Sequence, residues 1–194
     1  MQAAVSVFKG DDTRVMLDRE VIPGFVDDPT RKRVIAGFSA ELAAAVVAAG
    51  LPGRPPASFG PKCDLLALHM DGYLEAIEVK PQNVSSLAWV PAQATMYSKL
   101  LAFWIDNDPD WEDTIQRIFN QRQILGLIPP GFSMPAHLRP RVVPAVAFQR
   151  TASGPYVDRM FQVQDHLVQV GVGDPELTFY RASLSGRLMP VTGP

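Results

Sequence analysis

The strongest structural signal in the sequence lies in residues 64–80, DLLALHMDGYLEAIEVK. Two short apolar runs flank an Asp-Gly pair, a composition that predicts two β-strands joined by a tight turn. If residues 70–72 form a three-residue turn with Gly72 in the left-handed conformation, counting back along both strands places Asp64 directly opposite Glu78. Residues that face each other in this way have Cβ atoms about 5 Å apart. The sequence therefore predicts a hairpin with two carboxylates side by side at its open end.

The second strand of this hairpin ends in Glu78, Val79 and Lys80. Because side chains alternate along a strand, Glu78 and Lys80 share one face and Val79 points to the other. Two opposed carboxylates repel each other, so the pair requires a cation, which either Lys80 or a divalent metal ion can supply. The alternative without a metal is that Asp64 begins its strand in solvent and that Glu78 and Lys80 form an ion pair at an edge.

Helices are predicted on both sides of the hairpin. The segment before it is rich in helix-forming residues and ends at Gly50, which is typical of a helix C-terminus. A later β-branched run predicts a strand, in which Pro144 indicates a bend or an edge position. The expected elements are helices over 31–50, 91–104 and 111–127 and a strand over 141–149.

The two ends of the chain predict further strands. Alternation in residues 5–7, turn residues at 10–12 and an extended pattern at 14–17 indicate an N-terminal hairpin. Valines and a β-branched and aromatic run predict two or three strands within residues 156–184. The expected class is α/β, with helices packed on a mixed sheet in a single domain over residues 1–194.

The composition excludes several classes of protein. With 194 residues, of which 47% are hydrophobic, the chain can bury a core. The single cysteine, Cys63, excludes an internal disulfide, a cysteine zinc site and a four-cysteine iron–sulfur cluster. No apolar stretch approaches the roughly 20 residues of a membrane helix, and the start of the chain lacks a signal-peptide pattern, so we expect a cytoplasmic protein with no membrane partner. The net charge of −2 excludes a basic surface overall.

The arrangement of Asp64 and Glu78-Val79-Lys80 between two helices resembles the PD-(D/E)XK nuclease superfamily. The shared core of that superfamily runs helix, three strands, helix, strand. A restriction-endonuclease-like core of this kind would span about residues 38–149, with extra strands at both ends of the chain. The proline of the motif's name would directly precede Asp64, and here Cys63 takes that place.

Two helical features extend the resemblance. Glu41 on the first helix matches the upstream acidic residue that many members place near the metal. Gln93 and Tyr97 match the QxxxY element of the RecB-like branch, in which both side chains line the site. Glu41 and Tyr97 also have simpler interpretations: Glu41 lies near the start of the helix-forming run that begins at Phe38, where a glutamate suits the helix dipole, and Tyr97 lies on an apolar helix face that predicts core packing.

The resemblance implies a metal-dependent DNA nuclease that hydrolyses phosphodiester bonds. Asp64, Glu78 and the backbone carbonyl of Val79 would hold Mg²⁺ or Mn²⁺, and a second ion would recruit Glu41. Lys80 would position or deprotonate the attacking water or offset negative charge on the phosphate. The alternatives are an RNA-cleaving relative, a non-catalytic nucleic-acid-binding or assembly module with the same fold, and an unrelated α+β protein.

DNA is the partner that this interpretation implies. The net charge predicts weak, salt-sensitive binding by the chain alone, so a protein partner or a homo-oligomer is a further expectation. The basic side chains that could follow a phosphate backbone are Arg31, Lys32, Arg33, Arg54, Lys62, Arg117, Arg122, Arg139 and Arg141. The aromatic side chains that could stack on bases are Trp89, Trp104 and Trp111, for which burial in a core or an interface is the alternative.

Overall fold

The computed structural model describes residue 5 and residues 13–81, 85–149, 151–152 and 154–191. In this part of the chain, four α-helices and a short 3₁₀ helix combine with six strands. The elements are β1 (Arg14–Val21), α2 (Asp28–Ala48), β2 (Cys63–His69), β3 (Leu74–Lys80), η1 (Ser85–Trp89), α3 (Val90–Asn107), α4 (Trp111–Ile124), β4 (Val142–Gln149), α5 (Gly154–Gln169), β5 (Thr178–Ala182) and β6 (Leu188–Val191). The α/β class is confirmed.

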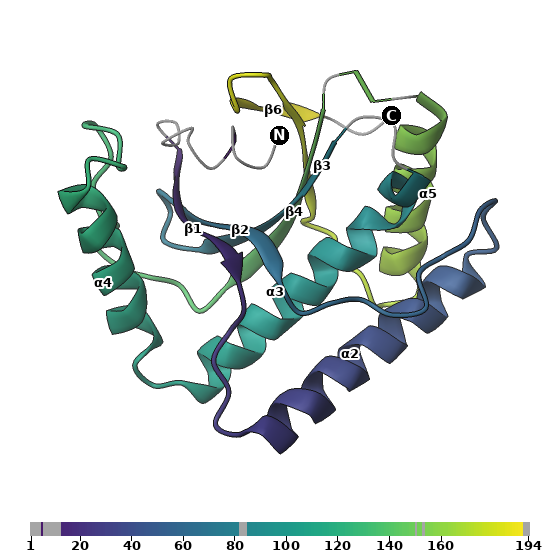
Figure 1. Ribbon diagram of the computed structural model, residues 1–194, viewed down its shortest axis with the longest axis horizontal. Coiled ribbons are helices and arrows are strands. Elements are labelled where there is room, and N and C mark those ends of the chain that lie inside the picture. The colour runs from purple at the N-terminus through teal and green to yellow at the C-terminus, as the bar shows by residue number, and fades with distance from the viewer. Residues whose placement is uncertain (1–4, 6–12, 82–84, 150, 153, 192–194) are drawn as a thin grey trace.

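All six strands form one mixed sheet in the order β1-β2-β3-β4-β5-β6. Neighbouring strands are antiparallel except for the pairs β3–β4 and β4–β5, which are parallel. Figure 1 shows α3 running along one side of this sheet, with α2 on its outer side and α5 next to its beginning. The molecule therefore has a helical layer on one face of the sheet, in which α3 makes the main contacts with β3 and β4, and residues of α5 share a buried cluster with β4.

The hairpin formed by β2 and β3 has the predicted turn. Gly72 has a φ of 88°, and the backbone N–H of His69 donates to the carbonyl of Tyr73 at 2.9 Å. The pairing of Leu65 with Ile77 has the register expected from a three-residue turn. Glycine adopts the left-handed conformation without steric cost, so the Asp-Gly sequence is sufficient to fix the register.

Alternation along the hairpin divides its apolar residues between two cores. One set faces the helical layer and packs with residues of α3: Leu66, Leu68, Leu74 and Ala76. The other set faces away from it: Leu65, Ala67, Ile77 and Val79. Because both faces are buried, a shift of the register by one residue would move each side chain into the wrong core.

The face of the sheet away from the helices holds a buried polar network. Arg14 on β1 forms an ion pair with Glu75 on β3 at 3.2 Å, and the Tyr180 hydroxyl on β5 donates to Glu75 at 3.1 Å. The Arg14 guanidinium also lies over the Tyr180 ring, 4.5 Å from its centre. These contacts connect three strands that are not neighbours in the sheet.

The predicted helix over 31–50 is α2, which begins slightly earlier. The Asp27 side chain accepts a hydrogen bond from the Thr30 backbone N–H at 2.7 Å, so it caps the helix at Asp28. Gly50 has the expected left-handed conformation after the helix, with a φ of 62°. The two predicted helices after the hairpin are α3 and α4, and none of the helices that the structure describes has the length and apolarity needed to cross a membrane.

The prediction of two or three strands within residues 156–184 is partly wrong. Residues 154–169 form α5, and only the final part of the segment is a strand, β5. The buried side chains of the helix recur every three or four residues: Val157, Met160, Val163, Gln164 and Leu167. This helical period outweighs the β-propensity of its valines.

Three other expectations also need correction. β1 pairs with β2 rather than with residues 5–7, and most of the expected N-terminal hairpin lies outside the described residues. Pro144 does not lie in an edge strand, because β4 lies between β3 and β5. Pairing with β5 begins only at Ala145, so Pro144 itself pairs with β3 alone. Finally, the described residues between α2 and α3 form two strands instead of three, and the strand next to β2 is β1, which precedes the helix.

Candidate functional site

Asp64 and Glu78 come together at the open end of the hairpin. Continuing the observed register by one residue beyond Leu65 and Ile77 places Asp64 opposite Glu78. The backbone N–H of Val79 donates to Asp64 Oδ2 at 2.9 Å, which fixes the Asp64 side chain against β3. The two carboxylates that the sequence singled out are therefore neighbours.

Glu78 is almost completely buried, with 1% of its surface exposed. Its Oε1 forms an ion pair with Lys80 Nζ, as alternation along the strand predicts. Its Oε2 is buried and accepts no hydrogen bond from an N–H or hydroxyl group of the described residues, while the Glu78 side chain lies within hydrogen-bonding reach of the Asp64 carboxylate. A buried carboxylate oxygen without a donor is costly, and this one lies close to the second carboxylate of Asp64. The pair thus has the features of a cation site.

The charge state of Glu78 reflects this environment. Burial is the main cause that raises the pKa of Glu78 to about 8; Lys80 acts in the opposite direction, and the nearby Asp64 carboxylate adds to the increase. Desolvation prevails because the carboxylate has one cationic partner and almost no contact with water. At neutral pH the metal-free site favours a proton on Glu78, and a divalent cation would compete for the same position.

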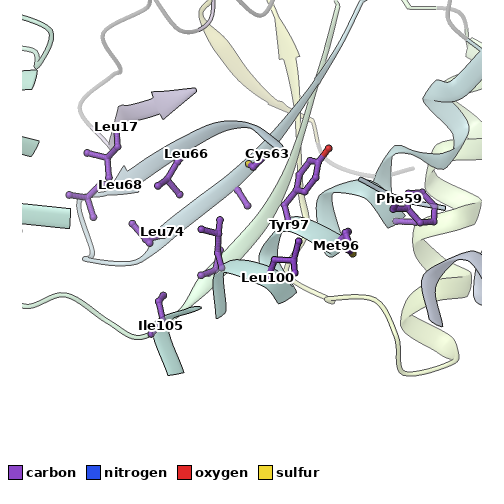
Figure 2. Packing of buried hydrophobic residues seen from close by; sticks show 14 of the residues in the cluster. Leu17, Phe59, Cys63, Leu66, Leu68, Leu74, Met96, Tyr97, Leu100 and Ile105 are labelled. Carbon is purple, nitrogen blue, oxygen red and sulfur yellow. The ribbon is translucent and has the colours of Figure 1, made fainter. Parts of the chain in front are cut away.

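Tyr97 and Gln93 extend the site onto α3. The Gln93 Nε2 group donates to the Tyr97 hydroxyl at 2.6 Å, one helical turn away. Figure 2 shows the Tyr97 ring on α3 with its hydroxyl oxygen pointing away from Met96 and Leu100. Burial raises the pKa of Tyr97, and the negative charge of Glu78 raises it further. Tyr97, which is 2% exposed, therefore packs its ring in the core and presents its hydroxyl to the acidic pair.

Cys63 lies beside the acidic pair as a buried thiol. Its Sγ donates to the Leu65 carbonyl at 3.1 Å. Burial raises the pKa of the Cys63 thiol, and the charge of Glu78 raises it further. A thiol of this kind is a poor nucleophile at neutral pH, so Cys63 acts here as a small packing residue.

Glu41 is not brought into contact with the acidic pair. Its Oε2 accepts a hydrogen bond from Lys99 Nζ on α3 at 2.6 Å, in an ion pair that is partly exposed. Within the described part of the chain, no three His, Cys, Asp or Glu side chains form a group that could hold a metal ion. The structure thus brings together two of the predicted metal ligands, Asp64 and Glu78, and the Val79 carbonyl stays a prediction.

Four of the nine basic residues named from the sequence form ion pairs with other described residues. Arg31 and Lys32 pair with Asp28, Lys62 pairs with Glu20, and Arg141 pairs with Glu176. Trp89 and Trp111 are buried, and the Trp104 Nε1–H donates to Asp108 at 2.8 Å, so none of the three offers a fully exposed ring for stacking.

Arg54 is different, because it lines a cavity with an arginine that sequence reasoning missed. Arg159 and Tyr156 reach the same cavity from the first turns of α5. The sequence does not predict Tyr156 and Arg159 as site residues, because residues 156–184 are predicted to form strands. The helical period of the apolar residues between 157 and 167 is the signal that would have placed them together.

Comparison with known proteins identifies no relative: no family of known sequences, no curated protein and no solved structure matches this chain. The chemical interpretation of the site therefore depends on its own geometry.

Proposed function

We propose that this protein is a metal-dependent nuclease that hydrolyses phosphodiester bonds in DNA, of the PD-(D/E)XK type. The observation that carries the proposal is the buried Glu78 Oε2, which has no hydrogen-bond donor among the described residues and lies beside the Asp64 carboxylate. A hairpin that needed only stability would not bury Glu78 beside the partly buried Asp64 carboxylate with a single lysine. The proposed role of the two carboxylates is to bind a cation.

The donor atoms suit Mg²⁺ or Mn²⁺. Mg²⁺ prefers oxygen ligands and is usually held by one or two carboxylates, with water and substrate phosphate filling the other positions. Asp64 and Glu78 supply two carboxylates, and the Val79 carbonyl is the third ligand that the family resemblance implies. When bound, such an ion would lower the pKa of a bound water and stabilise negative charge on the phosphate.

The side chains around the pair prepare the reaction. Lys80 Nζ lies against Glu78, where it can orient a water molecule and offset charge on a phosphate oxygen. The Val79 N–H holds Asp64 in place through a backbone hydrogen bond, which needs no side-chain ordering when substrate arrives. Tyr97 and Gln93 close the site on the side of α3.

Incubation of the purified protein with nucleic acids tests the proposal directly. Linear and circular DNA, single- and double-stranded, and RNA are each incubated with Mg²⁺ or Mn²⁺. We expect cleavage of DNA that disappears without metal and in Glu78→Ala and Lys80→Ala. Asp106→Asn is the matched control, because Asp106 is an exposed carboxylate on α3, outside the acidic pair, and its loss should leave cleavage unchanged.

Each substrate gives a different answer. Cleavage of RNA alone would replace DNA with RNA as the substrate and leave the site intact. Binding of Mn²⁺ that requires Glu78, without cleavage of any substrate, would favour a non-catalytic nucleic-acid-binding module. A folded protein that binds no metal ion would refute the site.

A further inference from the structure

A cavity lies where three separate segments of the chain meet. Its volume is about 400 Å³. Arg54 comes from the loop after α2, Trp89 from η1, and Tyr156 and Arg159 from the first turns of α5. We call this cavity the arginine pocket.

The two arginines of the pocket have no acidic partner. In the described ranges, neither Arg54 nor Arg159 forms an ion pair with an aspartate or a glutamate, in contrast to Arg31 and Arg141, which pair with Asp28 and Glu176. Two guanidinium groups that line one cavity repel each other, and an anion bound between them relieves that repulsion. The start of α5 at the pocket adds the positive end of a helix dipole.

Arg159 is held in a fixed orientation. One of its terminal nitrogens donates to the Pro52 carbonyl at 3.1 Å, and its guanidinium lies over the Tyr156 ring, 5.4 Å from the ring centre. The loop approaches closely at Gly53, whose φ of 120° suits glycine and where an added Cβ would lie 3.4 Å from the Trp89 ring. A guanidinium positioned in advance loses little freedom when it binds a phosphate.

The beginning of α3 connects the pocket to the candidate nuclease site. Trp89 directly precedes α3, and Gln93 follows one helical turn later, about 6 Å along the axis. Gln93 contacts Tyr97, whose hydroxyl faces the acidic pair. A strand bound at Glu78 that continues over the beginning of α3 therefore reaches the arginine pocket.

From this arrangement we infer that the arginine pocket binds a backbone phosphate of the nucleic-acid strand and positions that strand for cleavage. The planar guanidinium fork matches phosphate oxygens, and Arg54 reaches the cavity from its exposed rim. The identity of the ligand as a nucleic acid rests on the proposed function, whereas the binding of a phosphate follows from the pocket itself.

Fluorescence anisotropy of labelled DNA, single-stranded and duplex, tests this inference on the metal-free protein across a range of salt concentrations. Each phosphate contact contributes about 0.7 to the slope of log affinity against log salt for a single strand. We expect Arg54→Gln to weaken the binding of DNA about tenfold. For a single strand, the slope should decrease by about 0.7. Arg54→Gln should fold normally, because Arg54 is exposed and forms no hydrogen bond or ion pair with any other described residue.

The matched control is Arg19→Gln, an exposed arginine on β1 that lies outside the pocket and carries the same charge. The double variant Arg54→Gln with Arg159→Gln should lose more affinity than Arg54→Gln, whereas Arg19→Gln should change neither affinity nor slope. The inference is overturned if neither form of DNA binds at low salt, or if the pocket and control variants lose affinity equally.

Kinetics separate this inference from the nuclease proposal. Arg54→Gln should raise KM and leave kcat unchanged, while Glu78→Gln should abolish cleavage and retain affinity for DNA. If DNA binds through the two arginines but no metal supports cleavage, the nuclease proposal fails and the phosphate pocket stands. If the protein cleaves DNA and Arg54→Gln changes neither KM nor the salt slope, the pocket inference fails and the nuclease proposal stands.

Discussion

Asp64 on β2 accepts a hydrogen bond from the backbone N–H of Val79 on β3, at 2.9 Å. This bond holds the Asp64 carboxylate beside Glu78, the residue that precedes Val79 in the chain. The strand that carries one carboxylate therefore also fixes the position of the other. The arrangement depends on a backbone group, so substitutions of either carboxylate should leave the hairpin itself in place.

The first prediction concerns the pH dependence of stability. The pKa of Glu78 is about 8 in the folded protein, above its ordinary value of 4.5. Between pH 4.5 and about pH 8, the folded protein therefore keeps a proton on Glu78 that the unfolded chain has lost. The free energy of unfolding should then fall as pH rises through this window, by up to about 1.4 kcal/mol per pH unit. Glu78→Gln should remove that slope. Chemical denaturation from pH 5 to pH 9 measures it, and an unchanged slope in the variant would contradict the assignment.

The second prediction concerns metal binding. Mn²⁺ at about 100 times its Kd should stabilise the protein by about 2.7 kcal/mol, which a thermal melt detects. The effect should be larger at pH 8 than at pH 6, because Glu78 must lose its proton to bind the ion. Asp64→Asn should abolish the stabilisation. Glu41→Gln should retain it, because Glu41 pairs with Lys99, and a loss of the effect in that variant would show that Glu41 is a ligand.

The hairpin could be predicted from the sequence because local rules determine it. The Asp-Gly turn fixes the register, and alternation then decides which residues face the helices. The proximity of Asp64 and Glu78 follows from these two rules alone. Gln93 and Tyr97 could be placed on one helix by their spacing, yet only the packing of α3 against β3 shows that the Tyr97 hydroxyl faces the acidic pair.

Contacts between distant segments were beyond such rules. The pairing of β1 with β2 joins residues about 50 positions apart, and nothing in the sequence of β1 selects that partner over a nearby strand. The ion pair that engages Glu41 requires Lys99 on another helix. The arginine pocket combines Arg54 with Arg159, so it could not be foreseen while α5 was expected to form strands.

The third prediction separates the two roles of Tyr97. Tyr97→Phe keeps the buried ring and removes the hydroxyl that accepts a hydrogen bond from Gln93, so stability should fall by about 1 kcal/mol. If the hydroxyl helps to position the site, kcat for DNA cleavage should fall about tenfold with KM unchanged. Met96→Leu, a buried change of similar volume on the same helix, should cost less than about 1.5 kcal/mol and leave kcat unaltered.

The fourth prediction contrasts Glu75 with Glu78, two buried glutamates on the same strand. Glu75 faces Arg14 and Tyr180 on the opposite side of the sheet, where its carboxylate stabilises the fold through an ion pair and a hydrogen bond. Glu75→Gln removes the buried carboxylate that faces the Arg14 guanidinium and should destabilise the protein by about 3 kcal/mol. Tyr180→Phe should cost about 1.5 kcal/mol, the loss of one hydrogen bond to a charged group. Urea denaturation of both variants checks the ranking, and a neutral Glu75→Gln would mean that the ion pair does not stabilise this face.

The last prediction concerns the turn that sets the register. Gly72 has a φ of 88°, its carbonyl accepts a hydrogen bond from the Arg139 backbone N–H at 2.8 Å, and an added Cβ would overlap the backbone oxygen of His137. Gly72→Ala should therefore cost at least about 2 kcal/mol, from left-handed strain together with displacement of the neighbouring loop. Gly37→Ala is the matched control: Gly37 lies in α2 with open space around it, and alanine there should stabilise the helix by about 0.5 to 1 kcal/mol. The denaturation midpoint should fall in Gly72→Ala and rise in Gly37→Ala, and Mn²⁺ binding should weaken in Gly72→Ala only. This result would show that the turn positions the acidic pair, whereas equal midpoints in the two variants would show that it does not.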